Sequence, residues 1–140
     1  MPDVAGLAPR RIVWIAAAIT AGLSAFVVTN AARDSGTRTA AAVALTGGDP
    51  ARAPALFRRY GCSGCHTIPG VPGADGQTGA PLTGLSKHVY IAGVLENRSD
   101  NLTAWIVSPQ SFSPQTAMPT TGISEQEAKD LAAYLYAHRG

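Results

Sequence analysis

The chain has 140 residues, and its 11 Lys and Arg against 9 Asp and Glu give a formal net charge of only +2. This length accommodates one domain of ordinary size plus a tail or a membrane anchor. From Pro50 onward, seven cations and six anions leave one net positive charge, so the basic stripe that nucleic-acid binding requires is missing.

An apolar run follows Arg10 and Arg11, and no charged residue interrupts it before Arg33. As a helix, residues 12–32 would be about 30 Å long, enough to cross the hydrocarbon core of a bilayer. Trp14 lies near one end, where aromatic side chains favour the membrane–water interface. We therefore predict a transmembrane anchor over residues 12–32, with residues 1–11 in the cytoplasm.

A cleaved signal peptide is the alternative interpretation of the same segment. Its apolar region would be about 7–15 residues long, with small residues at a cleavage site close behind it. The run here is longer, and Thr29-Asn30-Ala31 matches such a site poorly. The sequence favours the uncleaved anchor.

The next segment, residues 33–49, is rich in Ala, Thr, Gly and Ser and lacks the pattern of a packed core. We predict a flexible periplasmic linker there, with its ends on the order of 20 Å apart. A domain spanning residues 50–140 should begin at Asp49-Pro50, because Asp is a good N-cap and Pro suits the first helical position. Its first helix is expected to end near Tyr60.

The rest of the domain is expected to alternate loops and helices. Residues 67–84 are rich in Gly and Pro, and a loop of this length in a compact domain indicates a bound group around which it wraps. Short helices are expected at residues 89–94 and 101–108, the second capped by Asn97 or Ser99 and ended by Pro109. A second loop follows to residue 122. Ser124 with Glu127 three positions on predicts a capping box at the start of the last helix.

The most informative motif is Cys62-Ser63-Gly64-Cys65-His66, whose spacing places both thiols on one face of a helical turn. Each thiol can add to one vinyl group of a haem, and His66 can bind the iron through an imidazole nitrogen. A thioredoxin-type redox pair would need a preceding strand, and none is expected. A structural zinc site needs four ligands, but the chain has only two Cys and three His. The motif predicts one haem c attached through Cys62 and Cys65.

The second axial position on the iron is assigned to Met118, the only Met after the apolar run. It lies in a Pro-bounded loop, whereas a Met that fills a core is more often found in a helix. His88 and His138 are the alternatives, but a surface position suits the first and a helix C-terminus suits the second. Ligation by His66 and Met118 would close the iron to substrates and raise its reduction potential. An open sixth position would instead indicate a haem sensor or peroxidase.

From about Pro50 to Arg139 the chain resembles the small class I cytochromes c. The resemblance implies an all-α fold, with a few short helices wrapped around one covalently bound haem, here preceded by a transmembrane helix. It also implies a contact between Phe57 and Tyr134 where the first and last helices cross. The motifs that carry it, in order, are Cys62-Ser63-Gly64-Cys65-His66, Gly79-Ala80-Pro81-Leu82, Asn101-Leu102-Thr103-Ala104-Trp105, Ala117-Met118-Pro119 and Ala133-Tyr134-Leu135.

The resemblance also implies roles for residues around the haem. Pro81 resembles the proline whose carbonyl accepts a hydrogen bond from the iron-binding His66, and Leu82 resembles a residue that packs on the haem. Trp105 resembles the tryptophan whose indole N–H bonds a haem propionate. Relatives often carry an Arg near the propionates, whereas Lys87 and His88 occupy that neighbourhood here.

The stretch from Tyr90 through Trp105 to Met118 is most similar to cytochromes c associated with haem–copper oxidases. This implies a membrane-tethered carrier of single electrons in a respiratory chain, which is not itself an enzyme and has no small-molecule substrate. Its donor would be a quinol–cytochrome c reductase or a dehydrogenase, and its acceptor a haem–copper oxidase. A fixed subunit of an oxidase or dehydrogenase complex is the alternative. The expected location is the bacterial cytoplasmic (inner) membrane, with the haem domain facing the periplasm.

Overall fold

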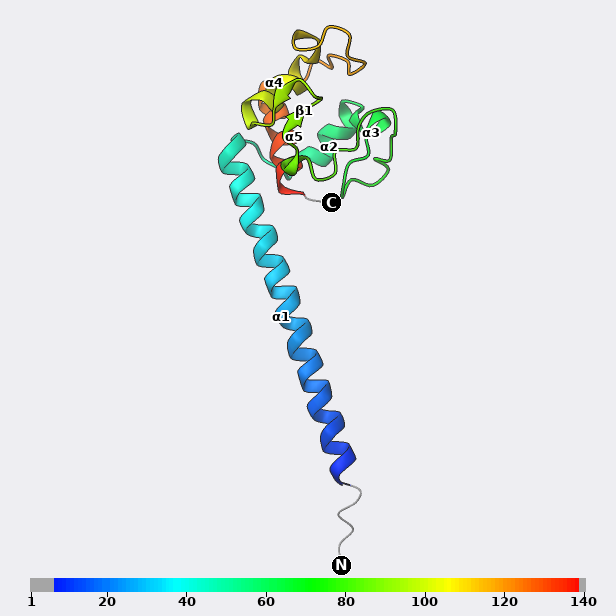
Figure 1. The fold of residues 1–140 in the computed structure, drawn as a ribbon, viewed down its shortest axis with the longest axis vertical. Coiled ribbons are helices and arrows are strands. Elements are labelled where there is room, and N and C mark those ends of the chain that lie inside the picture. Colours follow the sequence, from blue (N-terminus) through cyan, green and yellow to red (C-terminus); the bar gives the residue numbers. More distant parts are fainter. Residues whose placement is uncertain (1–6, 139–140) are drawn as a thin grey trace, which may run out of the picture. The chain divides into compact units, whose positions relative to one another are not determined.

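The computed structural model describes residues 7–138 and divides into two compact units, Met1–Gly36 and Thr37–Gly140. Residues 1–6 of the predicted cytoplasmic segment and the last two residues of the predicted domain lie outside the described part. Helix α1 spans Leu7–Thr46 and contributes to both units (Figure 1). Its Arg11–Thr46 portion is long and apolar enough to cross a membrane, by length and composition, and its large apolar side chains from Ile12 to Val28 are exposed.

The C-terminal part of α1 differs from the flexible linker predicted over residues 33–49. The chain is helical to Thr46, because this Ala- and Thr-rich stretch contains no Pro to interrupt the backbone hydrogen bonds. Ala42 and Thr46 are buried in the second unit. Gly48 is pressed against the last helix so closely that a Cβ atom there would lie 2.1 Å from the carbonyl oxygen of Lys129. The linker prediction is therefore wrong: residues 37–48 are part of the packed domain.

The turn after α1 begins at Gly47, which has a φ of +68° and donates its N–H to the carbonyl of Val43 at 2.8 Å. Asp49 was predicted to cap the first helix of the domain, but it does not. Its Oδ1 accepts a hydrogen bond from the N–H of Ala51 at 3.0 Å and forms a local turn. Helix α2 consequently begins later than expected and spans Ala53–Arg59.

The core forms where helix α5, Glu125–Ala137, packs against α2 and against helix α4, Ser99–Val107 (Figure 1). The predicted contact between Phe57 and Tyr134 is present, with ring centroids 5.4 Å apart in an edge-to-face arrangement. The predicted capping box of Ser124 and Glu127 starts α5 and is confirmed. The large side chains that these three helices bury in the core are Leu56, Phe57, Leu102, Trp105, Ile106, Leu131, Tyr134 and Leu135.

The prediction of a helix at residues 89–94 is wrong, because this segment forms most of a hairpin. Strands β1, Tyr90–Ile91, and β2, Leu95–Glu96, pair antiparallel. Ala92 and Gly93 between them have φ of +50° and +74°, and both values belong to the left-handed region that reverses a hairpin rather than to a right-handed helix.

Short turns connect the remaining elements. Helix α3 spans Cys62–Cys65, and the 3-10 turns η2 and η3 span Leu85–Lys87 and Pro109–Ser111. The expected loop at residues 67–84 contains no helix, and one isolated bridge joins Thr67 to Asp75. Helix α4 is confirmed, although its N-cap position is Arg98 rather than Asn97 or Ser99.

Candidate functional site

The two cysteines of the Cys-x-x-Cys-His motif begin and end the short helix α3, and His66 is the residue that follows it. Gly61 has a φ of +73°, and this left-handed residue turns the chain from α2 into the motif. The N–H of His66 donates to the carbonyl of Cys62 at 2.9 Å, and His66 itself is extended, with φ of −112°. Both thiols are free rather than joined in a disulfide. Burial raises the pKa of the Cys62 thiol, which favours its protonated form.

The imidazole of His66 is oriented by a backbone carbonyl. Its Nδ1 lies 2.7 Å from the carbonyl oxygen of Ala80, so Nδ1 carries the proton and Nε2 keeps the lone pair that binds a metal. The resemblance assigned this role to Pro81, and that assignment is wrong by one residue. The acceptor is Ala80 because hydrogen bonds on either side hold the segment in register: Gly79 N–H to Cys65 O at 2.7 Å, and Leu82 N–H to Thr67 O at 2.9 Å.

Two glycines let the loop approach the motif closely. A Cβ atom at Gly76 would lie 2.6 Å from backbone atoms of Gly64 and Cys65. One at Gly79 would lie 2.7 Å from Nδ1 of His66. Real Cβ contacts are essentially never shorter than about 3 Å, so both positions need a residue without a side chain. The backbone of the Gly-rich loop therefore packs directly against the motif and its histidine.

Met118 lies in the loop after η3 and is held through its backbone. Gln110 donates from Nε2 to the carbonyl oxygen of Met118 at 2.7 Å, while its Oε1 accepts from the hydroxyl of Thr120. The N–H of Met118 donates to Oγ1 of Thr116 at 3.3 Å. Gln110 therefore fixes the loop that carries the sulfur, and sequence reasoning missed it because nothing local pairs a loop glutamine with a carbonyl eight residues away.

The Trp105 indole approaches the sulfur of Met118. Its Nε1–H donates to Sδ at 3.1 Å, which brings together a buried ring on α4 and a half-buried side chain in the loop. The propionate contact implied for Trp105 stays a prediction. Leu82, also expected at the haem, is partly buried and packs against the core.

The alternative ligands are placed differently. His88 is exposed after η2. His138 stacks on Tyr134 with ring centroids 3.8 Å apart, and its Nδ1 lies 2.9 Å from the carbonyl oxygen of the same residue. Tyr134 in turn donates from its hydroxyl to the carbonyl of Pro69 at 2.7 Å. These contacts tie the end of α5 to the first loop, which is the structural role expected for His138.

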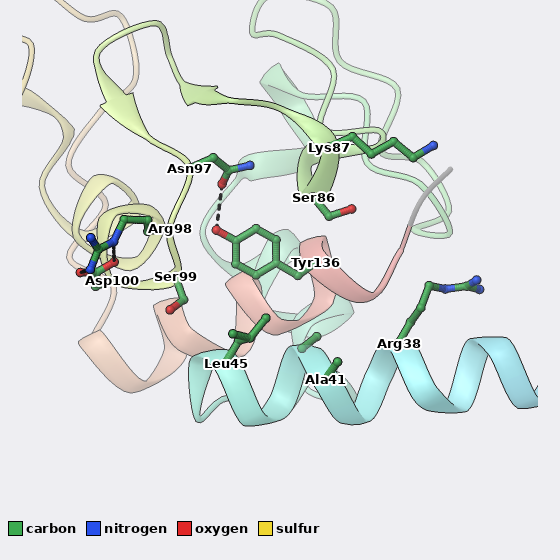
Figure 2. A pocket seen from close by; sticks show the side chains of 11 residues that line it. Arg38, Ala41, Leu45, Ser86, Lys87, Asn97, Arg98, Ser99, Asp100 and Tyr136 are labelled. Carbon is green, nitrogen blue, oxygen red and sulfur yellow. Dashed lines mark hydrogen bonds and ion pairs between the residues drawn. The ribbon is translucent and has the colours of Figure 1, made fainter.

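A surface pocket of the second unit lies elsewhere, between the end of α1, η2 and the start of α4 (Figure 2). Asn97 and Tyr136 meet inside it, where the Tyr136 hydroxyl donates to Asn97 Oδ1 at 2.8 Å. Burial, followed by the charge of Asp100, raises the pKa of Tyr136 to about 12. None of the residues expected to attach, bind or pack on the haem lines this pocket, although Lys87, expected in the neighbourhood of the propionates, does.

The residues at the motif fit a covalently bound haem. Two free thiols lie one helical turn apart, and His66 presents Nε2 while Nδ1 is held. The carbonyl of Ala80 supplies the partner that a metal-binding imidazole needs on its other nitrogen. Met118 supplies a thioether sulfur from a second, separately fixed loop.

Comparisons with known proteins agree with this chemistry. A family model described as cytochrome c matches residues 50–138. Cytochrome c oxidase subunit 2 of Alkalihalophilus pseudofirmus is 38% identical over 81 residues, which cover 57% of this chain and 23% of that protein. Cytochrome c oxidase subunit 2 of Bacillus subtilis is 32% identical over 84 residues, which cover 57% of this chain and 24% of that protein. The aligned part of the chain thus spans about a quarter of the length of these curated relatives.

No solved structure gives a significant match to this chain. The family match covers well over half of the sequence, and the described part of the chain, built of helices and loops with a single two-stranded hairpin, agrees with the predicted all-α fold. This chain therefore belongs to the cytochrome c family, and it is an electron-transfer protein whose haem c is attached through Cys62 and Cys65.

Proposed function

We propose that the protein carries single electrons through one haem c whose iron is bound by His66 and Met118. The observation that carries this proposal is the hydrogen bond of 2.7 Å between His66 Nδ1 and the carbonyl oxygen of Ala80, because it leaves Nε2 to bind the iron. A haem iron with one His and one Met ligand supplies reversible gain and loss of one electron at a raised potential.

The surrounding residues hold the two ligands in place. Ala80 keeps the imidazole in one tautomer and one orientation, and Gly79 lets the loop lie against it. Gln110 and Thr116 hold the backbone of Met118. Ligands held this firmly need not rearrange when an electron arrives or leaves, and they exclude water and peroxide from the metal. The protein's work is to keep the site rigid, so we expect no enzymatic turnover of a small molecule.

The respiratory role rests on the apolar helix and on the named relatives. Helix α1 would anchor the chain in the bacterial inner membrane, with the haem domain in the periplasm, where haem attachment of this kind is expected. Electrons would come from a quinol–cytochrome c reductase or a dehydrogenase and pass to a haem–copper oxidase. The relatives named cytochrome c oxidase subunit 2 support an oxidase as the acceptor.

A second candidate, a fixed subunit of an oxidase or dehydrogenase complex, is favoured by one specific observation. Residues 37–48 pack into the second unit rather than forming a loose linker, so less free chain is left to let the domain travel. Purification in mild detergent distinguishes the two. A subunit copurifies with the other cofactors of its complex in unit ratio, whereas a carrier separates from them.

The decisive experiment on the site replaces Met118 with Ala in the full chain loaded with haem. The unmodified ferrous protein should bind carbon monoxide slowly, and the variant should bind it rapidly and have a lower midpoint potential. An unchanged absorption spectrum in the variant would show that Met118 is no ligand. Rapid binding by the unmodified protein would instead favour a haem sensor or peroxidase.

A further inference from the structure

We propose that the end of α1, residues 37–46, is a hinged strap that docks reversibly on the rest of the second unit and pivots at Gly47. The docked strap shortens the free chain between the membrane anchor and the haem domain, and the released strap lengthens it. The use of this change rests on the proposed function, in which α1 anchors a haem domain that carries electrons. The docking itself depends only on contacts within the second unit.

The strap is held on the domain by a small contact. Within residues 37–46 only Ala42 and Thr46 are buried, with 2% and 7% of their surface exposed. Both side chains are small, and hydrophobic stabilisation is roughly proportional to the apolar area removed from water. The larger side chains of Val43 and Leu45 are 39% and 66% exposed. The hydroxyl of Thr46 donates to the carbonyl of Ala42 at 2.8 Å, so its proton is used inside α1 rather than across the contact.

Two surface pockets adjoin the strap. The one described above has a volume of about 920 Å³, and Arg38, Ala41, Ala42 and Leu45 line it from the strap (Figure 2). The second, of about 580 Å³, is lined by Leu45 and Thr46 together with residues of α4, η3 and the start of α5. Atoms beside such open space lack the dispersion contacts that a close-packed interior provides. The strap is therefore bound weakly.

The chain immediately after the strap is held firmly. Asp130 on α5 accepts the N–H of Asp49 at 2.8 Å, and Gln126 donates to the carbonyl of Gly47 at 3.1 Å. Gly48 lies directly against the backbone of α5. Gly47 has a φ of +68°, and a Cβ atom added to it would meet nothing within 4 Å. A glycine in open space can absorb the change in backbone angles that a hinge requires. The strap can thus swing while Gly48 and Asp49 stay in place.

Release of the strap changes the reach of the domain. Four residues, 33–36, separate the predicted membrane span from the strap, and fully extended they cover about 13 Å. The strap adds about 15 Å if it stays helical and about 33 Å if it is extended. The docked form keeps the domain near the end of its anchor, and the released form lets it reach a separate partner. Docking therefore suits a fixed subunit and release suits a carrier.

The test measures distances in the full-length, haem-loaded protein in lipid nanodiscs by pulsed electron paramagnetic resonance. Spin labels are attached to cysteines that replace two exposed alanines, Ala40 on the strap and Ala55 on α2. We expect two distances, one from the docked strap and a longer, broader one from the released strap. Ala42→Glu puts a charge into the buried contact and should raise the ratio of released to docked protein at least tenfold. Ala44→Glu is the matched control, since Ala44 is exposed on the same helix and lines neither pocket.

A single distance between Ala40 and Ala55, whether docked or released, overturns the inference. Equal ratios in the Ala42 and Ala44 variants overturn it too, because burial of Ala42 is then not what docks the strap. A second label pair, on Ala55 and the exposed Glu125 of α5, should give one distance in every variant. If Ala42→Glu alters that distance, the substitution disturbs the domain, and the two distances measured without it decide.

These distances do not depend on the sixth ligand of the iron. A failure of the strap therefore leaves the carbon monoxide test of Met118 unaffected. Rapid binding of carbon monoxide by the unmodified protein would refute the proposed function and leave the docking equilibrium as measured.

Discussion

A Cβ atom at Gly79 would lie 2.4 Å from Cε1 of His66, closer than any real contact between such atoms. The imidazole therefore packs directly on the backbone at Gly79, one residue before the carbonyl that holds its Nδ1. The same short segment supports the ring by contact and by hydrogen bonding.

Replacing Gly79 with Ala should displace the His66 ring, because the new methyl group occupies its place. We expect overpacking to destabilise the protein by about 1–3 kcal/mol and to weaken the bond from His66 to iron. Urea unfolding and the haem absorption spectrum measure these two effects. Gly64→Ala is the matched control, since Gly64 lies within the motif but its added Cβ meets nothing within 4 Å. Equal behaviour of the two variants would contradict the packing described here.

Asp130 on α5 holds the segment between α1 and α2. Its fully buried side chain forms an ion pair with Arg52 at 2.8 Å and accepts the N–H of Asp49 at 2.8 Å. Asp130→Asn should cost about 3 kcal/mol in the free energy of unfolding, because a buried charge network loses its anion. Asp100→Asn breaks a pair with Arg98 in which both side chains are 64% exposed, and because solvent screens such a pair it should change the free energy of unfolding much less. Chemical denaturation of both variants gives the comparison.

Ala92 is the only non-glycine residue of the described chain with a positive φ, at +50°. A Cβ atom in this region costs on the order of 1 kcal/mol, so Ala92→Gly should stabilise the hairpin by up to about that amount. Gly93→Ala places the same strain at a φ of +74° and should destabilise it. Thermal unfolding of the two variants should shift in opposite directions, and a parallel shift would argue against the left-handed turn.

Ionisation of Tyr136 should make the free energy of unfolding depend on pH in the alkaline range. Burial, and secondarily the charge of Asp100, raises its pKa from the ordinary value of 10.0 to about 12. The folded state holds this proton more tightly than the unfolded chain does. The contribution of the protonated Tyr136 hydroxyl to the free energy of unfolding is therefore complete below pH 10 and is lost as pH rises toward about 12. The free energy of unfolding of Tyr136→Phe should fall less over this window than that of the unmodified protein. Tyr60 and Tyr134, whose pKa values are also raised, provide the background common to both.

Electron transfer to an oxidase should depend only weakly on ionic strength. From Pro50 onward, seven cations nearly balance six anions, so long-range attraction between charges contributes little to encounter. Anchoring in the same membrane would supply the high local concentration instead. Stopped-flow rates from about 0.01 to 0.15 M salt, a range in which the Debye length shortens from about 30 to 8 Å, provide the measurement. A steep fall with salt would contradict this mode of encounter.

Local chemistry accounts for what was predicted correctly. The thiol spacing and His66 predicted the covalent haem, and Ser124 with Glu127 predicted the start of α5, because these features depend on residues within one helical turn. The contact between Phe57 and Tyr134 was predicted from the family resemblance and is present. The hairpin was missed because short apolar runs do not distinguish a strand from a helix, and the positive φ of Ala92 is not typical of alanine.

The linker was mispredicted for a related reason. Small residues at 37–48 carry too little apolar surface to indicate a core, yet Ala42 and Thr46 are buried, and the absence of a side chain lets the backbone at Gly48 approach α5. That contact depends on the shape of a distant helix, and it is held by Asp130 from the far end of the sequence.

Residue type and close spacing were enough to predict the cofactor, its attachment and the pair of candidate axial ligands, because bond formation depends on which atoms are present and how near they lie along the chain. The folded structure was needed to show that Ala80 rather than Pro81 holds His66, that Gln110 holds Met118, and that Trp105 donates to the sulfur. Each of these is a directional hydrogen bond between segments that share no local register, so the partner is chosen by packing to within one residue.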